Sequence, residues 1–296
     1  MVNPCPLMLT GIMFSVCFAA DTYQDGDCAL KIQKNGMSLL NEGMKLIDPD
    51  IKIAGRFHEA LRDLYQNVNK EHTLNITKTY LQNITIESNG TTFHAIDGFN
   101  KKRVFEKRYI YLYTTMAVYK KLNSILREHD CTTNTLSEGD LYYAPYSAVL
   151  MSVLMYWSNL TEFRGLTYRG ADLPETDINK YTVNKRFVWT QFTSTSTNKS
   201  NAFDRNVTFI IYNNQSSPYM APKPVYLFAW KPELDEAIYC PGAEFEVLRV
   251  EKNISDSVGS AIITLQTVIS TSDSGDCRRQ PFMLNIIALF IFLLSF

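Results

Sequence analysis

The sequence lacks the short motifs that mark several common enzyme chemistries. It has no G-x-S-x-G, H-E-x-x-H, P-loop or G-x-G-x-x-G segment, which argues against α/β-hydrolases, zincins, P-loop nucleotide hydrolases and Rossmann domains. It also has no Cys-x-x-Cys pair, so no structural zinc site is predicted. A histidine triad or histidine-rich metal site is improbable as well, because the chain has only four histidines: His58, His72, His94 and His129.

An excess of charge of either sign is missing too. The 29 basic and 30 acidic side chains leave a net charge of -1, without a basic block or an acidic tail. No nucleic-acid partner is therefore predicted. Hydrophobic residues make up 46% of the chain, enough for a sizeable core. No repeat or low-complexity linker divides the sequence, which favours a single domain.

Neither end carries an apolar run long enough for a comfortable membrane span. Residues 7–20 (LMLTGIMFSVCFAA) precede a polar stretch that begins at Asp21. This pattern predicts a signal peptide over residues 1–20, although no Lys or Arg precedes the apolar run. Residues 281–296 (PFMLNIIALFIFLLSF) follow small residues and a polar spacer, which is the pattern of a GPI-attachment signal.

The two ends together predict an exported protein. The mature chain would span 21–272, with 273–296 removed on attachment of the lipid. We expect it at the extracellular face of the plasma membrane, GPI-anchored through the lipid, or secreted. Eight N-glycosylation sequons agree with export: Asn75, Asn83, Asn89, Asn159, Asn198, Asn206, Asn214 and Asn253.

Export also predicts oxidised cysteines. The signal peptide contains two of the six, so the mature candidates are Cys28, Cys131, Cys240 and Cys277. Four thiols allow three pairings, and the sequence alone does not choose among them. If the anchor is attached within residues 272–275, Cys277 is removed and an odd thiol remains.

The hydrophobic pattern changes along the chain. Apolar residues recur at helical spacing over 57–68 and 112–126, and 148–157 is predicted as a buried helix. Residues 72–100 carry few apolar repeats, so we expect a surface excursion there. After Trp157, short β-branched and aromatic runs predict strands at 207–212, 225–228, 245–250 and 261–265. Helices over 21–157 followed by strands over 158–268 predict an α+β domain whose helical part covers a sheet.

Three polar segments in the strand-rich half carry the candidate chemistry. Arg169 in 166–171 (LTYRGA) can reach a phosphate where Gly170 lets the backbone turn. The alternating hydroxyls of 192–197 (FTSTST) suit a ribose. A carboxylate within the acidic segment 231–248 can stabilise the oxocarbenium ion that forms when a glycosidic bond breaks. Taken singly, the arginine and the acids are more typical of a solvated surface, and the hydroxyl run is more typical of an edge strand or a helix cap.

In order along the chain, these segments resemble the Arg–Ser–Glu signature of ADP-ribosyltransferases. The resemblance is strongest to the GPI-anchored ecto-enzymes that modify arginine, and it covers residues 21–272. It implies an α+β fold in which a helical N-terminal region packs on a split, mixed β-sheet core with an NAD cleft. It also implies NAD as co-substrate without a metal, and an extracellular protein as acceptor.

The resemblance assigns roles to individual residues. Arg169 matches the ligand of the NAD phosphates, and Ser194 matches the residue that holds the nicotinamide-side ribose. Phe192 stands at the family's position before that serine, and 202–203 match the helix that follows it. The residues assigned to NAD binding are Tyr168, Arg169, Gly170, Ser194, Thr195 and Ser196.

Two placements of the catalytic glutamate remain open. Residues 244–248 (EFEVL) match the family's E-x-E-V-L literally, which would make Glu246 the catalytic acid. Aligning 225–242 (VYLFAWKPELDEAIYCPG) instead puts Glu236 at that position. The second alignment also keeps the usual distance to the last strand, so we favour Glu236.

This choice makes the E-x-E motif degenerate. The upstream glutamate, which the family links to arginine as acceptor, becomes Leu234, and a leucine cannot orient a guanidinium. Asp235 would point to the other side of an extended segment. The predicted function is transfer of ADP-ribose from NAD to a protein side chain, arginine by resemblance, with release of nicotinamide. The alternatives are NAD hydrolysis with water as acceptor, and a catalytically silent surface glycoprotein.

Overall fold

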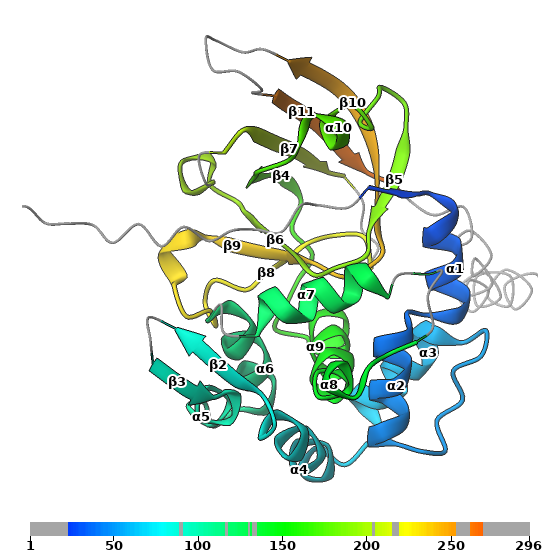
Figure 1. Ribbon diagram of the computed structural model, residues 1–296, viewed down its shortest axis with the longest axis vertical. Helices are drawn as coiled ribbons and strands as arrows, with labels where there is room; N and C mark the ends of the chain where they lie inside the picture. Colours follow the sequence, from blue (N-terminus) through cyan, green and yellow to red (C-terminus); the bar gives the residue numbers. More distant parts are fainter. Residues whose placement is uncertain are drawn as a thin grey trace, which may run out of the picture.

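The structure is a computed structural model that describes residues 23–88, 91–115, 118–129, 131, 135–202, 205–214, 219–252 and 261–268. The predicted signal peptide at 1–20, the predicted anchor signal at 273–296 and Cys277 lie outside these residues. The described chain is α+β, as expected. Helices α1 to α9 lie together in one part of the molecule, and the nine-stranded mixed sheet lies in the other (Figure 1).

Helices α1 to α9 precede strands β4 to β11, whereas β1 precedes the helices, β2 and β3 lie among them and α10 lies among the strands. The helices are α1 Asp27–Asn35, α2 Ser38–Ile47, α3 Phe57–Gln66, α4 Lys70–Leu81, α5 Ala95–Asn100, α6 Phe105–Thr114, α7 Tyr119–Glu128, α8 Glu138–Leu141, α9 Ala144–Tyr156 and α10 Glu175–Ile178. The strands are β1 Gln24–Asp25, β2 Thr85–Ser88, β3 Thr91–His94, β4 Gly165–Ala171, β5 Arg186–Trp189, β6 Thr193–Ser196, β7 Val207–Asn213, β8 Lys223–Pro224, β9 Glu236–Tyr239, β10 Ala243–Lys252 and β11 Ala261–Thr267. Short 3-10 turns occur at Lys199–Asn201 and Pro232–Leu234.

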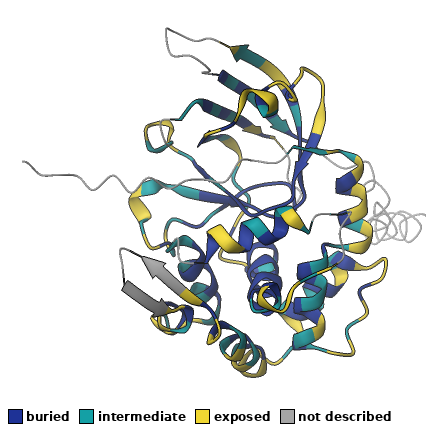
Figure 2. Ribbon diagram, viewed as in Figure 1, coloured by how far each residue is buried: buried dark blue, intermediate teal, exposed yellow. Residues whose placement is uncertain are grey.

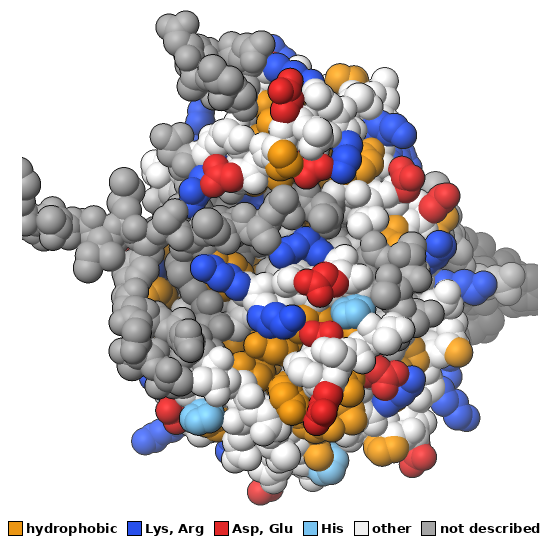
Figure 3. Space-filling view, viewed as in Figure 1, with side chains coloured by type: hydrophobic (Ala, Val, Ile, Leu, Met, Phe, Trp, Pro, Cys, Tyr) orange, Lys and Arg blue, Asp and Glu red, His pale blue; other side chains and the backbone are white. Residues whose placement is uncertain are grey.

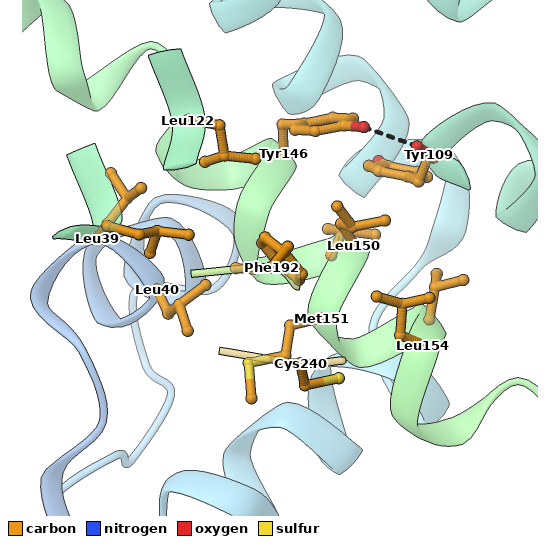
Figure 4. Close-up of a cluster of buried hydrophobic side chains, with 14 of the residues drawn as sticks. Leu39, Leu40, Tyr109, Leu122, Tyr146, Leu150, Met151, Leu154, Phe192 and Cys240 are labelled. Carbon is orange, nitrogen blue, oxygen red and sulfur yellow. Dashed lines mark hydrogen bonds between the residues drawn. The ribbon is translucent and has the colours of Figure 1, made fainter. Parts of the chain in front are cut away.

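Helix α9 forms the centre of the helical part. Pro145 stands in its first turn, where no backbone N–H is needed, and all of its residues except Tyr156 are buried. Gly43 of α2 lies so close to α9 that an added Cβ would be 2.0 Å from the Ala144 carbonyl oxygen. The Tyr146 hydroxyl donates to the Tyr109 carbonyl oxygen at 2.7 Å, which links α9 to α6 (Figure 4).

Three expectations about local structure were wrong. Residues 70–81 form α4, and its Thr73, Thr77 and Leu81 are buried, so this part of 72–100 is not a surface excursion. The single helix expected over 112–126 is two helices, α6 and α7. Residues 225–228 form a turn closed by the Phe228 backbone N–H on the Val225 carbonyl at 2.8 Å. The Phe228 ring packs on Trp157, 4.7 Å between centroids, which favours this turn over a strand.

The large sheet is split between two of its strands. Its order is β1-β5-β10-β11-β7-β4-β6-β9-β8, and of these pairs β11 and β7 run parallel. Strand β4 pairs with β7 at seven positions but with β6 at one, Tyr168 opposite Ser196. The two parts of the sheet therefore diverge on either side of this pair, and the divergence opens space between β4 and β6.

Two hydrophobic cores lie on opposite faces of β5 and β9. Val188 and Ile238 belong to the helical core, whereas the neighbouring Phe187, Trp189 and Tyr239 belong to a second core within the sheet. This alternation follows from the two-residue period of a strand. The buried positions of Figure 2 run along these strands and into α9. The strands thus form a wall shared by both cores.

One disulfide is present among the described residues. Cys28 of α1 bonds Cys131, with 5.8 Å between their Cα atoms, and Cys240 is a buried free thiol. Closing a long loop in this way stabilises the fold chiefly by restricting the unfolded chain. None of the described helices has both the length and the apolar character that a membrane span requires.

Candidate active site

A cleft opens where β4 and β6 diverge. It encloses about 70 Å³, with walls from both parts of the split sheet and from α6 and α7. All the residues that the sequence predicted for the site line it: Tyr168, Arg169, Gly170, Ser194, Thr195, Ser196 and Glu236. The fold therefore brings together side chains that are up to 68 positions apart in sequence (236 minus 168).

Arg169 is held at the split by its own hydrogen bond. Its side chain is 5% exposed on β4, and Nη1 donates to the Ser194 carbonyl oxygen at 2.8 Å. The guanidinium carbon lies 6.0 Å from the centre of the Trp189 ring, close enough for a cation–π contact. Arg169 is thus a positioned cation in the cleft, suited to a phosphate.

Ser194 and Glu236 come from neighbouring strands and both line the cleft. Strands β6 and β9 are antiparallel, with Ser196 opposite Glu236. Burial raises the pKa of Glu236 to about 7, and hydrogen bonding from the Ser194 side chain opposes the rise. The carboxyl group therefore titrates near neutral pH, as groups in enzyme sites often do.

The other two hydroxyls of the Ser-Thr-Ser segment bind backbone. Thr195 Oγ1 donates to the Ala237 carbonyl oxygen at 2.9 Å, and Ser196 Oγ donates to the Leu234 carbonyl oxygen at 2.8 Å. Both hydroxyls use their proton to tie β6 to β9 and its preceding turn. Of the three, Ser194 is the one whose side chain lowers the pKa of Glu236.

The helical half contributes residues that the sequence did not single out. The Tyr113 hydroxyl of α6 donates to the Phe192 carbonyl oxygen at 3.0 Å. Asn123 of α7 donates through Nδ2 to Tyr113 at 3.1 Å and to the same carbonyl at 3.0 Å. Tyr119 lines the cleft beside them. The helical spacing of 112–126 marked this segment as core, and no motif marked its polar atoms.

The turn before Glu236 directs one acid into the cleft and another away from it. Asp235 has a left-handed backbone, with φ of 49°, and its Oδ2 accepts from Asn201 at 3.1 Å and Asn198 at 3.3 Å. Leu234 and Glu236 line the cleft. Among the described residues that line it, Glu236 is the only carboxylic acid.

The competing glutamate lies elsewhere. Glu246 is on β10 opposite Gln266, whose Nε2 donates to its carboxylate at 3.3 Å. Arg186 Nη2 is 3.6 Å from the same oxygen. Neither Glu246 nor Glu244 is among the residues lining the cleft. The structure therefore places Glu236 beside Arg169 and Ser194, and places Glu246 outside that group.

Metal-binding residues do not cluster in the described part of the chain. No group of three or more His, Cys, Asp or Glu side chains there is arranged to hold a metal ion. His58 packs edge-on against Tyr219, with 4.6 Å between ring centroids, and burial lowers its pKa to about 4. The His129 ring contacts Asp140 at 3.2 Å. Both of these histidine rings are therefore held by neighbouring side chains.

Comparison with solved structures identifies the fold of this chain. No protein-family model and no curated protein sequence matches the chain. The ADP-ribosyltransferase HopU1 of Pseudomonas syringae pv. Tomato DC3000 is similar with a TM-score of 0.53 and 18% identity, over 69% of this chain and 99% of HopU1. The ADP-ribosyltransferase Vis of Vibrio splendidus, in complex with an inhibitor, gives 0.48 and 18% over 71% and 91% of the two chains. This chain has the fold of HopU1.

Proposed function

We propose that this protein cleaves NAD and transfers the ADP-ribosyl group to a protein side chain, with release of nicotinamide. The observation that carries the proposal is the convergence of Arg169, Ser194 and Glu236 in one cleft at the split of the sheet. The fold shared with an ADP-ribosyltransferase supports it. A cation, a hydroxyl and a carboxylate are the three kinds of group that a phosphorylated ribose and a developing oxocarbenium ion require.

Each group has a separate role in the proposed reaction. Arg169 binds the pyrophosphate of NAD, and Ser194 holds the ribose next to nicotinamide. The C1′–N bond breaks, and its electron pair leaves with nicotinamide, which becomes neutral. The Glu236 carboxylate accepts a hydrogen bond from the ribose 2′-hydroxyl and stabilises the positive charge left on the ribose. A nucleophile then forms a bond to C1′ and loses its proton to solvent.

The acceptor side of the cleft favours a nucleophile other than a guanidinium. An arginine acceptor needs acids to orient and deprotonate it, and Leu234 occupies the position next to Glu236 in the cleft. The Asp235 carboxylate is bound to Asn198 and Asn201. Water as acceptor, which makes the protein an NAD glycohydrolase, is therefore the second candidate.

NAD labelled separately in the nicotinamide and the adenosine tests these readings together. Release of labelled nicotinamide with adenosine label retained on protein supports transfer. Release of nicotinamide with the adenosine label recovered as free ADP-ribose supports hydrolysis. If the purified protein neither consumes NAD nor is thermally stabilised by it, the enzymatic proposal is wrong and a silent surface glycoprotein remains.

A matched pair of variants tests the role of the carboxylate. Glu236→Gln keeps the shape of the side chain and removes its charge, so nicotinamide release should fall by about 10³-fold or more, as when a preorganised charge is lost. Glu246→Gln, on β10, should retain most of the activity. The reverse pattern would assign the role to Glu246 and remove the cleft from the mechanism.

We also propose that the protein is exported and works outside the cell, with a lipid-anchored or secreted mature chain of 21–272. Five of the six sequon asparagines within the described residues are exposed, which supports access for glycans: Asn75, Asn83, Asn159, Asn198 and Asn214. The disulfide between Cys28 and Cys131 is typical of an oxidising compartment. Mass spectrometry of the mature termini tests both predicted cleavages.

A further inference from the structure

The turn over 233–235, just before Glu236, is tied to the segment 196–201 at the end of β6. All three backbone carbonyl oxygens of the turn accept a hydrogen bond from that segment. The donors, in order along the turn, are Asn201 Nδ2 at 2.7 Å, Ser196 Oγ at 2.8 Å and the Thr197 backbone N–H at 3.0 Å. The turn is therefore held along its whole length by residues that follow Ser194.

The Asp235 carboxylate adds a further tie between the same two segments. Its Oδ2 accepts from Asn201 Nδ2 at 3.1 Å and from Asn198 Nδ2 at 3.3 Å. Asn198 is itself fixed, because its Oδ1 accepts from the backbone N–H of Ser200 at 3.1 Å and from the Ser200 hydroxyl at 2.8 Å. We call Asn198, Asn201 and Asp235 the asparagine clamp.

The backbone of Asp235 adopts a conformation that needs such support. Its φ of 49° is left-handed, and residues other than glycine rarely adopt this region. Aspartate and asparagine tolerate it best, because their short polar side chains bond to groups nearby. Glu236 is the next residue and the first of β9. The conformation of Asp235 therefore sets the direction in which β9 and its first side chain begin.

The contacts of Asp235 point to support and not to acceptor chemistry. Leu234 and Glu236 line the cleft, and Asp235 between them is not among its lining residues. Lys and Arg side chains are spread over the visible face of the molecule (Figure 3), yet the two donors that bind Asp235 Oδ2 are neutral amides. The carboxylate therefore keeps its charge while it fixes the turn.

We propose that Asn198, Asn201 and Asp235 are positioning residues, which hold the turn so that the Glu236 carboxyl group stays directed into the cleft. The inference rests on the proposed function, in which Glu236 stabilises the oxocarbenium ion. Arg169 is held separately, by the Ser194 carbonyl oxygen. Loss of the clamp should therefore lower kcat more than it raises KM for NAD, because the transition state and not the bound dinucleotide loses a contact.

Three substitutions at Asp235 separate the side chain from the backbone. Asp235→Asn keeps an oxygen acceptor and tolerates the left-handed conformation, so kcat for nicotinamide release should stay close to that of the parent. Asp235→Gly adopts this conformation freely but has no acceptor, so kcat should fall about 10- to 100-fold, as when a reacting group is misplaced. Asp235→Ala should lose at least as much. Asp177→Ala, which removes a surface ion pair with Lys180, is the control.

A pair of variants tests the other side of the clamp. Asn198→Asp replaces the donor by a second carboxylate and should lower kcat as much as Asp235→Gly. Asn198 also begins a sequon, so this change removes any glycan attached there. Lys199→Pro removes the same sequon and leaves Asn198 in place. Proline fits the first position of this 3-10 turn, after an extended Asn198, so kcat should be unchanged.

The pH profile distinguishes positioning from a general loss of stability. The other titratable or charged side chains that line the cleft are Arg169, Tyr113, Tyr119 and Tyr168. Burial raises the pKa of Glu236 to about 7, and a loosened turn would let water reach its carboxyl group. The acid limb of kcat/KM should therefore move below pH 7 in Asp235→Gly and stay in place in Asp235→Asn.

The outcomes separate this inference from the proposed function. Full activity of Asp235→Gly and Asn198→Asp in a protein that consumes NAD would overturn the inference and leave the proposed function standing. A lower Tm in these variants with an unchanged pH profile and an unchanged ratio of kcat to KM would reduce the clamp to a structural role and overturn it as well. A parent protein that does not consume NAD would refute the proposed function itself.

Discussion

The two halves of the molecule build the cleft in different ways. The strand-rich half supplies Arg169, Ser194 and Glu236, each from a separate strand and each held by the sheet. The helical half supplies Tyr113 and Asn123, which bind the Phe192 carbonyl oxygen at the edge of β6. One half therefore presents the charged groups, and the other holds the strand on which Ser194 lies.

The two hydrophobic cores also differ in the kinds of side chain that they contain. The core within the sheet is rich in aromatic rings, and Trp189 of that core lies under the Arg169 guanidinium. The helical core is mainly aliphatic and includes Phe192, just before β6, and Cys240, just after β9 (Figure 4). Because β5 and β9 contribute alternate residues to both cores, a disturbance of either core reaches the cleft. Removal of a charged group should nevertheless lower the catalytic activity more than removal of a supporting hydrogen bond.

After the loss expected for Glu236→Gln, the largest effect should again come from the strand-rich half. Arg169→Ala removes the positioned cation and the bond to the Ser194 carbonyl oxygen, so kcat/KM for NAD should fall on the order of 10²- to 10³-fold. Arg169→Lys keeps the charge without the planar fork and should lose about 10-fold. Nicotinamide release measures both. Arg164→Ala, exposed just before β4, is the control, and an equal loss there would contradict a specific role for Arg169.

The next largest effect should be a pH dependence of activity and stability that arises from ionisation of Glu236. Its pKa of about 7 lies above the usual value of 4.5, so kcat/KM should fall by up to tenfold per pH unit below pH 7 as the carboxylate is protonated. The unfolded chain loses this proton at lower pH than the folded chain. The free energy of unfolding should therefore decrease as pH rises from about 4.5 to 7.

Glu236→Gln separates the two consequences of that pKa. The variant cannot ionise at this position, so it should be more stable than the parent at pH 8 and equally stable at pH 4. Thermal unfolding at the two pH values measures the difference. Equal stability at both would contradict a raised pKa, even if catalysis still followed the expected pH profile.

The smallest effect should come from the helical half. Tyr113→Phe removes the hydroxyl that donates to the Phe192 carbonyl oxygen, while Asn123 still binds that oxygen. We expect a loss of about 1 kcal/mol in the free energy of unfolding, seen as a Tm lower by about 2–4 °C. NAD turnover should fall a few-fold. Tyr111→Phe, on the same helix, is the control, and a loss as large as that of Arg169→Ala would make Tyr113 more than a support.

Much of the candidate site could be predicted because its residues form ordered local motifs. The Ser-Thr-Ser segment and the arginine before a glycine are both readable in a single sequence, and both line the cleft. Tyr113 and Asn123 could not be found in this way, since their apolar neighbours at helical spacing marked α6 and α7 as core. Their polar atoms can be recognised as part of the site only when β6 is packed against these helices.

The expected strand at 225–228 failed for a related reason. Its β-branched and aromatic residues are typical of strands, yet Phe228 is drawn onto Trp157 and the backbone turns. Strand propensity is a weak preference that packing overrides. The long-range contact with the end of α9 is not visible in a local window of sequence.

The sequence alone determined the α+β class and the residue types available for the site, because hydrophobic period and motif order are local properties of the chain. Only the tertiary structure decided which glutamate shares the cleft with Arg169 and Ser194. That choice depends on strand register: β9 pairs with β6 and brings Glu236 opposite Ser196, whereas β10 pairs with β5 and β11 and carries Glu246 elsewhere. A literal motif match carries no information about register, so the two placements could be separated only in three dimensions.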